Sequence, residues 1–250
     1  RVASCAPLEL LPSWALPASA APGEPAAPTL RPWRECRHGG IVAQFARAAR
    51  NAQRAGFDGV EVHAANSYLL DQFLRDSTNQ RTDRYGGSIE NRARLTLEVT
   101  QAVVDIWGSD RVGIRLSPVT PDAGNTPPDS TVMATYGHLI QQLNRFNLVY
   151  LHFVEGATAT SRSVPDGVDL DALRAQFNGP FIGNNNYDLD LAIARRAEGR
   201  IDAVAFGRLF IANPDLVERL QRGMPLAVAP RASYYGGGAA GYTDWPTASP

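Results

Sequence analysis

The chain has 250 residues, of which 44% are hydrophobic and 20% are charged, and its formal net charge is −1. These values are ordinary for a soluble globular protein, and they give no electrostatic basis for binding nucleic acid or an anionic membrane. The two cysteines, Cys5 and Cys36, form no metal-binding or disulfide pattern, and no apolar run approaches membrane-spanning length. Prolines interrupt the apolar N-terminal stretch, so we expect no signal peptide and a cytoplasmic location.

The first half of the chain divides into an irregular arm and an alternating region. Residues 1–40 are rich in Pro and Ala without a sustained period, which predicts a long arm. Apolar positions three and four apart predict a helix over about 41–55, and a short apolar run at 59–63 predicts a buried strand. A short helix, a polar loop and a long helix follow in turn, and Ser88 is placed to cap the long helix.

The second half continues the same alternation. Further strands are predicted near residues 114, 150, 182 and 204, with helices over about 130–145, 168–177, 188–197 and 213–221. Helix–strand alternation predicts a parallel sheet with right-handed crossovers. A closed barrel of this type needs eight strands, and the pattern supplies five. We therefore predict an α/β fold over residues 41–250, a TIM (β/α)8-type barrel that is incomplete, with about five βα units.

Three polar side chains follow the strand at 59–63 within six residues. They are His63, Asn66 and Tyr68, and a helix-like run begins directly after them. Parallel sheets place binding and catalytic groups at the carboxyl ends of their strands. Each residue alone is more simply explained by capping or packing, but the three together favour a functional site. By contrast, we predict that Arg81 and Arg92 pair with the nearby acidic residues Asp83 and Glu90 and that these charges serve structure.

Several segments resemble the old yellow enzyme family of FMN-dependent ene-reductases. The similar segments are residues 63–74, 81–94, 113–118, 206–210, 213–216, 235–238 and 241–244. They occur in the family's order and span most of the chain after residue 40. The resemblance implies an FMN-binding α/β barrel that passes a hydride from NADPH or NADH to a small-molecule activated alkene.

The resemblance also implies roles for individual residues. His63 and Asn66 match the pair that donates hydrogen bonds to the substrate carbonyl, where negative charge develops in the reaction. Tyr68 matches the residue that protonates the α-carbon. Arg115 matches a cation beside the flavin pyrimidine, and Tyr235 lies in a segment expected to form a lid over the substrate.

Phosphate binding is expected at the loops that follow the last two barrel strands, as in other barrels. The residues concerned are Gly183, Asn184, Asn185 and Asn186 in the first loop and Gly207 and Arg208 in the second. One position departs from the family, which commonly has Gly where this chain has Asn185. Asn tolerates a left-handed backbone, but its side chain is a candidate to crowd the phosphate.

The resemblance begins just after the family's third strand, so the first three barrel strands and their flavin-ring contacts have no counterpart. Two hypotheses follow. One is an ene-reductase of α,β-unsaturated carbonyl compounds; the other is a catalytically inactive partial barrel that does not hold FMN on its own. A longer natural protein would restore the first hypothesis, and a homo-oligomer could cover the open edges of the sheet.

Overall fold

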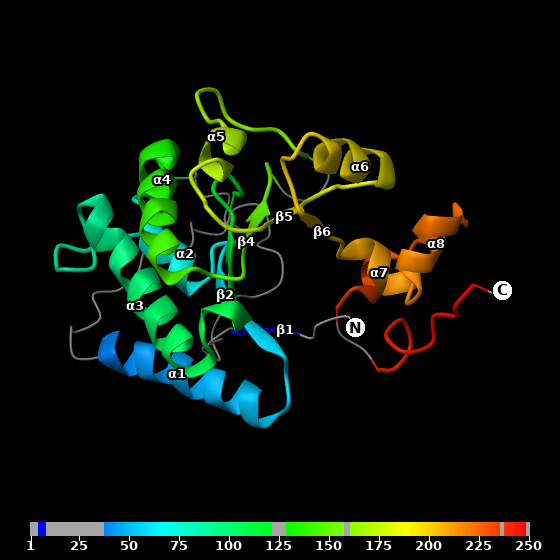
Figure 1. Ribbon diagram of the computed structural model, residues 1–250, viewed down its shortest axis with the longest axis horizontal. Coiled ribbons are helices and arrows are strands. Elements are labelled where there is room, and N and C mark those ends of the chain that lie inside the picture. The colour runs from blue at the N-terminus through cyan, green and yellow to red at the C-terminus, as the bar shows by residue number, and fades with distance from the viewer. Residues whose placement is uncertain (1–4, 9–37, 122–128, 158–160, 236–237, 249–250) are drawn as a thin grey trace.

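The computed structural model describes residues 5–8, 38–121, 129–157, 161–235 and 238–248. Six parallel strands form one sheet in chain order (Figure 1). They are β1 (Cys5–Leu8), β2 (Gly59–Ala64), β3 (Val112–Leu116), β4 (Tyr150–Val154), β5 (Phe181–Asn184) and β6 (Ala203–Ala205). The five predicted strands are confirmed. Because β1 and β6 each pair with a single described strand, the sheet is an open part of a barrel.

Helices connect the strands of the sheet. They are α1 (His38–Arg54), α2 (Leu69–Leu74), α3 (Ile89–Trp107), α4 (Val132–Leu143), α5 (Leu170–Arg174), α6 (Leu189–Ala197), α7 (Arg208–Ala212) and α8 (Leu216–Arg222). Short 3-10 turns occupy Ser109–Arg111, Asn144–Phe146 and Arg231–Ser233. The predicted cap is confirmed, because Ser88 Oγ accepts a hydrogen bond from the Asn91 amide at 3.4 Å. The short helix α7 was not predicted.

Strand β1 lies within the segment that the sequence predicted to be an irregular arm. Its four residues, Cys-Ala-Pro-Leu, show no strand period and include a proline. The strand forms through parallel pairing with β2, in a register that runs from Cys5 opposite Gly59 to Leu8 opposite Val62. Proline lacks an N–H donor and is tolerated in edge strands, which is the place that β1 occupies. The strand therefore depends on a long-range partner that local pattern does not reveal.

The two faces of the sheet differ in chemistry. Alternate residues of β2 to β4 are fully buried and apolar, and they join one hydrophobic core with α1, α3 and α4. Examples are Val62, Ile114 and Phe153. The intervening residues point to the other face, because side chains alternate along a strand. That second face carries charged and polar side chains, and it holds the candidate site.

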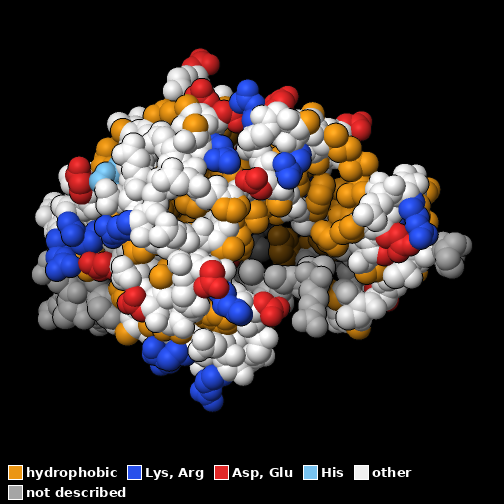
Figure 2. All heavy atoms as spheres, viewed as in Figure 1, with side chains coloured by type: hydrophobic (Ala, Val, Ile, Leu, Met, Phe, Trp, Pro, Cys, Tyr) orange, Lys and Arg blue, Asp and Glu red, His pale blue; other side chains and the backbone are white. Residues whose placement is uncertain are grey.

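The region of α6, α7 and α8 is less covered than the rest. Ile193 on α6 and Val217 on α8 are each 59% exposed, and α6 has no buried residue. Figure 2 shows hydrophobic side chains on the surface below α6 and beside a hollow that faces the α7–α8 region. The described residues therefore leave apolar surface at the β6 end of the sheet. Within the described ranges, no helix combines the length and apolar character needed to cross a bilayer.

Candidate active site

The turn that follows β2 brings two of the predicted catalytic residues together. His63 is the penultimate residue of β2 and is 6% exposed, and its Cα lies opposite Arg115 in the ladder with β3. The rings of His63 and Tyr68 meet edge to face, with centroids 5.0 Å apart. Tyr68 immediately precedes α2, so β2 positions the His63 ring and the start of α2 positions the Tyr68 ring. Asn66 lies in the turn between them.

The backbone of this turn is unusual. Asn66 and Ser67 have φ angles of 54° and 61°, so two consecutive residues with side chains adopt the left-handed conformation. Such residues are strained, and Ser tolerates this conformation less well than Asn. The two amides are held from outside the turn: Asn66 N–H donates to Ser117 Oγ at 2.6 Å, and Ser67 N–H donates to Asp71 Oδ2 at 2.8 Å.

Arg115 of β3 is connected to the far strands of the sheet. Its Nη2 donates to Asn184 Oδ1 at 3.0 Å, and Asn184 Nδ2 donates to the carbonyl of Ala205 at 2.7 Å. These contacts link β3, β5 and β6 at their carboxyl ends, across β4. Two of the predicted cofactor-binding residues, Arg115 and Asn184, are thus in direct contact. In the ladder of β2 and β3, the Cα of Arg115 lies opposite that of His63.

A buried acid–histidine pair lies on the same face of the sheet. Glu61 Oε2 and His152 Nδ1 are 2.9 Å apart. Burial opposes ionisation of Glu61, but the hydrogen bond and charge of His152, together with the charge of Arg115, outweigh it and hold its pKa below the usual 4.5. Glu61 therefore remains an anion beside the Arg115 cation. Neither Glu61 nor His152 was predicted as a site residue.

Replacing Glu61 by glutamine is expected to remove an acid-sensitive contribution to stability. The pKa of Glu61 is lower in the folded chain than in the unfolded chain, so its contribution is present above the unfolded pKa and is lost as pH falls through the folded pKa. Urea unfolding at several pH values should show the free-energy difference between wild type and Glu61→Gln shrinking below the usual pKa of 4.5. A difference that persists unchanged into strong acid would contradict this assignment.

The predicted phosphate loop is shaped by asparagines. Asn185 and Asn186 have φ angles of 97° and 51°. The Asn185 amide nitrogen lies 2.8, 2.8 and 2.9 Å from the carbonyl oxygens of Glu155, Ala157 and Ser161, to which it donates. Its side chain is therefore directed at the loop after β4, where it joins the two loops. The crowding of a phosphate that the sequence suggested does not follow from this orientation.

The second half of that loop meets Arg208. Asn186 Oδ1 accepts a hydrogen bond from Arg208 Nη2, at the start of α7. Asn186 Nδ2 is buried and has no hydrogen-bond partner among the described residues. A Cβ added at Gly207 would meet nothing within 4 Å, so there is open space at this position. The Arg208 guanidinium and the open space at the neighbouring Gly207 suit a phosphate group.

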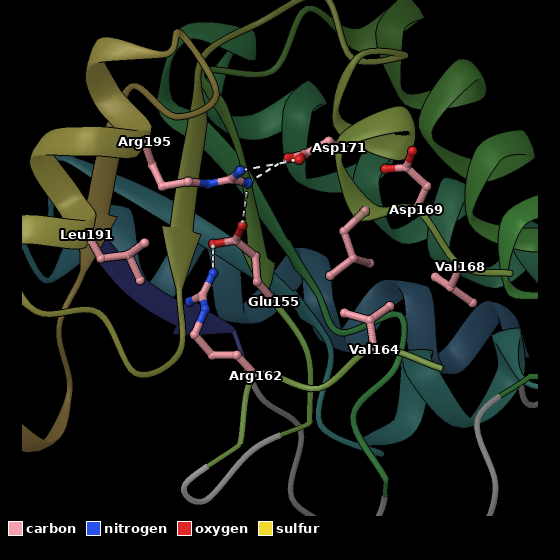
Figure 3. A pocket seen from close by; sticks show the side chains of 9 residues that line it. Glu155, Arg162, Val164, Val168, Asp169, Asp171, Leu191 and Arg195 are labelled. Atoms are coloured by element: carbon pink, nitrogen blue, oxygen red, sulfur yellow. Dashed lines mark hydrogen bonds and ion pairs between the residues drawn. The ribbon is translucent and has the colours of Figure 1, made fainter. Parts of the chain in front are cut away.

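An ion-pair network around Glu155 lies next to the predicted phosphate loop, since the Glu155 amide donates to the Asn184 carbonyl at 3.0 Å; Figure 3 shows Glu155 with Arg162, Arg195 and Asp171. Glu155 accepts a hydrogen bond from the Tyr187 hydroxyl at 2.5 Å and pairs with Arg195 at 3.3 Å and Arg162 at 3.7 Å. Arg195 also pairs with Asp171 at 2.5 Å. Burial and the Glu155 carboxylate raise the pKa of Tyr187 to about 12. The cavity there has a volume of about 500 Å³, and four of its charged lining residues, Glu155, Arg162, Asp171 and Arg195, belong to the network, so we assign the network to loop support.

Gly183 packs closely against this network. A Cβ at Gly183 would lie 2.6 Å from the Tyr187 hydroxyl and 2.8 Å from Glu155 Oε2. The ends of these two side chains would therefore have to shift to make room for a larger residue. The resemblance pointed to Gly183 as a phosphate-binding residue, whereas the structure gives it a packing reason to be glycine. Its predicted role in cofactor binding stays a prediction.

Tyr235 does not join the other predicted residues. Its side chain is 88% exposed, so it packs on no part of the site in this structure. Adjoining residues 236–237 of the predicted lid segment lie outside the described residues. The lid role of Tyr235 remains a prediction.

One of the two ion pairs predicted for the arginine-rich loop is confirmed. Arg81 pairs with Asp83, as expected. Arg92 instead pairs with Asp129 at 3.2 Å, on the loop that precedes α4. The sequence placed this partner too close along the chain, because Asp129 approaches Arg92 only through the packing of α3 on α4.

The residues that hold the turn were missed as well. Asp71 and Ser117 fall inside segments that carry the family resemblance, but neither had a predicted role. The available signal was Asp71 itself, which lies in the first turn of a predicted helix, four residues after Ser67 and four before Arg75, in reach of both. Ser117 follows the end of β3 and is connected to the turn only by sheet pairing, which a local pattern does not show.

Polar side chains converging at the carboxyl ends of parallel strands define an α/β-barrel site. Comparison with known proteins agrees. The profile of the NADH:flavin oxidoreductase / NADH oxidase family matches residues 39–227. The chain is 47% identical over 211 residues to putative 12-oxophytodienoate reductase 2 of Oryza sativa subsp. japonica. The aligned region covers 82% of this chain and 55% of that protein. It is 42% identical to 12-oxophytodienoate reductase 2 of Arabidopsis thaliana, over 83% of this chain and 56% of that protein.

Solved structures show the same relationship. Morphinone reductase in complex with tetrahydroNAD superposes with a TM-score of 0.81 and 46% identity, covering 88% of this chain and 58% of that one. The old yellow enzyme from Trypanosoma cruzi gives a TM-score of 0.80 and 40% identity, over 86% and 57% of the two chains. The chain belongs to the old yellow enzyme family, the NADH:flavin oxidoreductase / NADH oxidase family. It spans a little more than half the length of these relatives.

Proposed function

We propose that this chain carries the substrate- and phosphate-binding part of an FMN-dependent oxidoreductase, which reduces the C=C bond of α,β-unsaturated carbonyl compounds with NADH or NADPH. The observation that carries the proposal is the contact of His63 with Tyr68 at the same strand level as Arg115. A hydrogen-bond donor, a phenol and a fixed cation are the groups that this reaction requires. They lie on one edge of the sheet, on the family's fold.

The residues present suit FMN in two places. Arg208 and the buried Asn186 amide would hold the phosphate, and Arg115, held by Asn184, would lie beside the ring. When bound, FMN supplies the hydride transfer between the nicotinamide and the alkene. The Arg115 cation would stabilise negative charge on the reduced ring. Asn185 keeps its own donors on neighbouring carbonyls and leaves the phosphate to Asn186.

The turn after β2 would act on the substrate. His63 and Asn66 donate hydrogen bonds to the carbonyl oxygen, where charge accumulates, and so polarise the alkene. A phenol holds its proton at neutral pH, so Tyr68 serves as the acid for the α-carbon. The edge-to-face contact with the His63 ring fixes where that proton is held. The rigid turn therefore places two donors and an acid before the substrate arrives.

A second candidate is a partial barrel that does not hold FMN on its own and is inactive. The open edges at β1 and β6 favour it, as do the exposed apolar side chains of α6 and α8. The two candidates differ in one property, the ability of this chain to retain a flavin.

Reconstitution with FMN tests the proposal. We expect the purified chain to acquire the visible flavin spectrum, to lose it on addition of NADPH or NADH, and to regain it when an enone is added. Riboflavin, which lacks the phosphate, is the matched ligand. Arg208→Ala should weaken FMN binding by about tenfold or more and leave riboflavin binding unchanged, since it removes a charge-assisted hydrogen bond to phosphate. A chain that stays colourless after reconstitution would support the inactive partial barrel.

A further inference from the structure

We propose that Ser117 and Asp71 are positioning residues for the catalytic turn: they hold the left-handed backbone of Asn66 and Ser67 and so aim Asn66 and Tyr68 at the substrate. The inference rests on the proposed function for its last step, the effect on substrate. Its first step, control of the turn by two buried acceptors, stands on the structure alone. Neither residue had a role in the sequence analysis.

The strained backbone of the turn has to be stabilised by residues outside it. Asn66 and Ser67 are consecutive residues with φ angles of 54° and 61°, a conformation that L-residues with side chains adopt rarely and singly. Within the turn itself, Tyr68 N–H donates to the Ala65 carbonyl at 3.1 Å. The amides of Asn66 and Ser67 instead donate to side chains outside the turn. Strained backbone at a functional site persists where its surroundings fix it.

The two acceptors are well suited to that task. Ser117 Oγ accepts from the Asn66 amide at 2.6 Å, and Asp71 Oδ2 accepts from the Ser67 amide at 2.8 Å. Both residues are fully buried, so water does not compete for these amides. Ser117 stands one residue beyond β3, and Asp71 lies in the first turn of α2. The turn is thereby attached to the neighbouring strand and to its own helix.

A second set of contacts immobilises the acceptors. Arg75 Nη2 donates to Asp71 Oδ2 at 2.7 Å and to the Ser117 carbonyl at 3.2 Å. The Tyr136 hydroxyl, on α4, donates to Asp71 Oδ1 at 2.7 Å, and Ser117 Oγ lies 3.4 Å from Asp71 Oδ2. Burial and the Asp71 carboxylate hold the pKa of Tyr136 well above its usual value, so the hydroxyl stays a donor. The acceptors therefore have fixed positions before any ligand binds.

The network contains its own control. Ser117 and Tyr136 each donate a hydroxyl hydrogen bond to Asp71, and both are buried. Of these two hydroxyls, Ser117 Oγ is the one that also accepts from the turn. Ser117→Ala and Tyr136→Phe thus each remove one hydroxyl from the same carboxylate. A purely structural network predicts similar consequences for both variants, whereas a positioning role predicts a difference confined to residues 65–68.

Amide hydrogen exchange on the chain without added flavin decides the first step. In Ser117→Ala, we expect the Asn66 amide to exchange faster by about tenfold, the factor that corresponds to loss of one buried hydrogen bond. Tyr136→Phe should change this rate much less, because Ser117 Oγ remains in place as the acceptor. Ser117→Cys, which fills similar space with a weak acceptor, gives the same comparison if the alanine variant is too unstable. Equal exchange of Asn66 in wild type and in the Ser117 variants would overturn the proposal.

Phenol binding to FMN-loaded protein tests the second step. Phenols present an oxygen to the same donors as a substrate carbonyl. We expect phenol affinity to fall several-fold in Ser117→Ala and to fall clearly less in Tyr136→Phe, which leaves Ser117 Oγ in place to accept from the Asn66 amide. Equal affinities in both variants would overturn the positioning of Asn66. A wild-type chain that binds no FMN would count against the proposed function, while the exchange experiment would still decide the role of Ser117.

Discussion

His63→Ala combined with Asn66→Ala is expected to lower kcat/KM for an enone by at least about a hundredfold, because it removes both donors to the developing oxyanion. Loss of a single such donor costs about 100- to 1,000-fold in comparable sites. Phenol affinity should fall in the same variant. The measurement is steady-state reduction of an enone, with phenol titration followed by the flavin spectrum. FMN content must be equal to that of wild type.

The chain offers a matched control. His138 on α4 is half-buried and Asn178 is exposed, and replacing both by alanine makes the same change in composition without altering any residue of the candidate site. We expect wild-type phenol affinity and activity from that variant. If the His63 and Asn66 variant bound phenol as tightly as wild type while carrying FMN, these two residues would not be the carbonyl-binding pair.

The sequence predicted most of the fold because the decisive patterns are local. The apolar runs of β2 and β3 and the capped helix α3 each show their periodicity within a single window. Strand β1 was missed because four residues that include Pro7 carry no such pattern, and only the ladder with β2 makes them a strand. The open sheet was predicted from the strand count, because the pattern supplies five strands and a closed barrel needs eight.

The candidate site was predictable to the extent that it is contiguous. His63, Asn66 and Tyr68 lie within six residues, so one strand end revealed them. The Arg115–Asn184 contact joins residues 69 positions apart and depends on the sheet register. Asn185 was expected to face the phosphate, and its three carbonyl partners come from a loop that only the fold brings near. Side-chain direction at such a turn is decided by these neighbours.

The strength of the ion pair between Asp71 and Arg75 was likewise not predictable from the sequence. In sequence it is an acidic and a basic residue four apart on a helix, which is the pattern of a weak surface ion pair. In the structure the two side chains are 0% and 1% exposed. The same spacing therefore describes a contact of very different strength, and burial decides which one it is.

Arg75→Leu is accordingly expected to lower the free energy of unfolding by about 3–5 kcal/mol, because it leaves the Asp71 carboxylate buried without its cation. Urea unfolding measures the change. Arg84→Leu is the matched control: Arg84 pairs with Glu98 at 3.1 Å and its side chain is 57% exposed. We expect that substitution to cost less than about 1 kcal/mol, since solvent screens an exposed pair.

A double substitution separates the lost pair from the uncompensated charge. Adding Asp71→Asn to Arg75→Leu removes the buried anion and keeps one carbonyl oxygen, which can take the place of Oδ1 and accept from Tyr136, or of Oδ2 and accept from the Ser67 amide. The double variant should therefore be more stable than Arg75→Leu alone, although it carries one more substitution. If the double variant were instead the less stable of the two, the cost would lie in lost packing of the Arg75 side chain, and the buried charge would not be what makes this pair important.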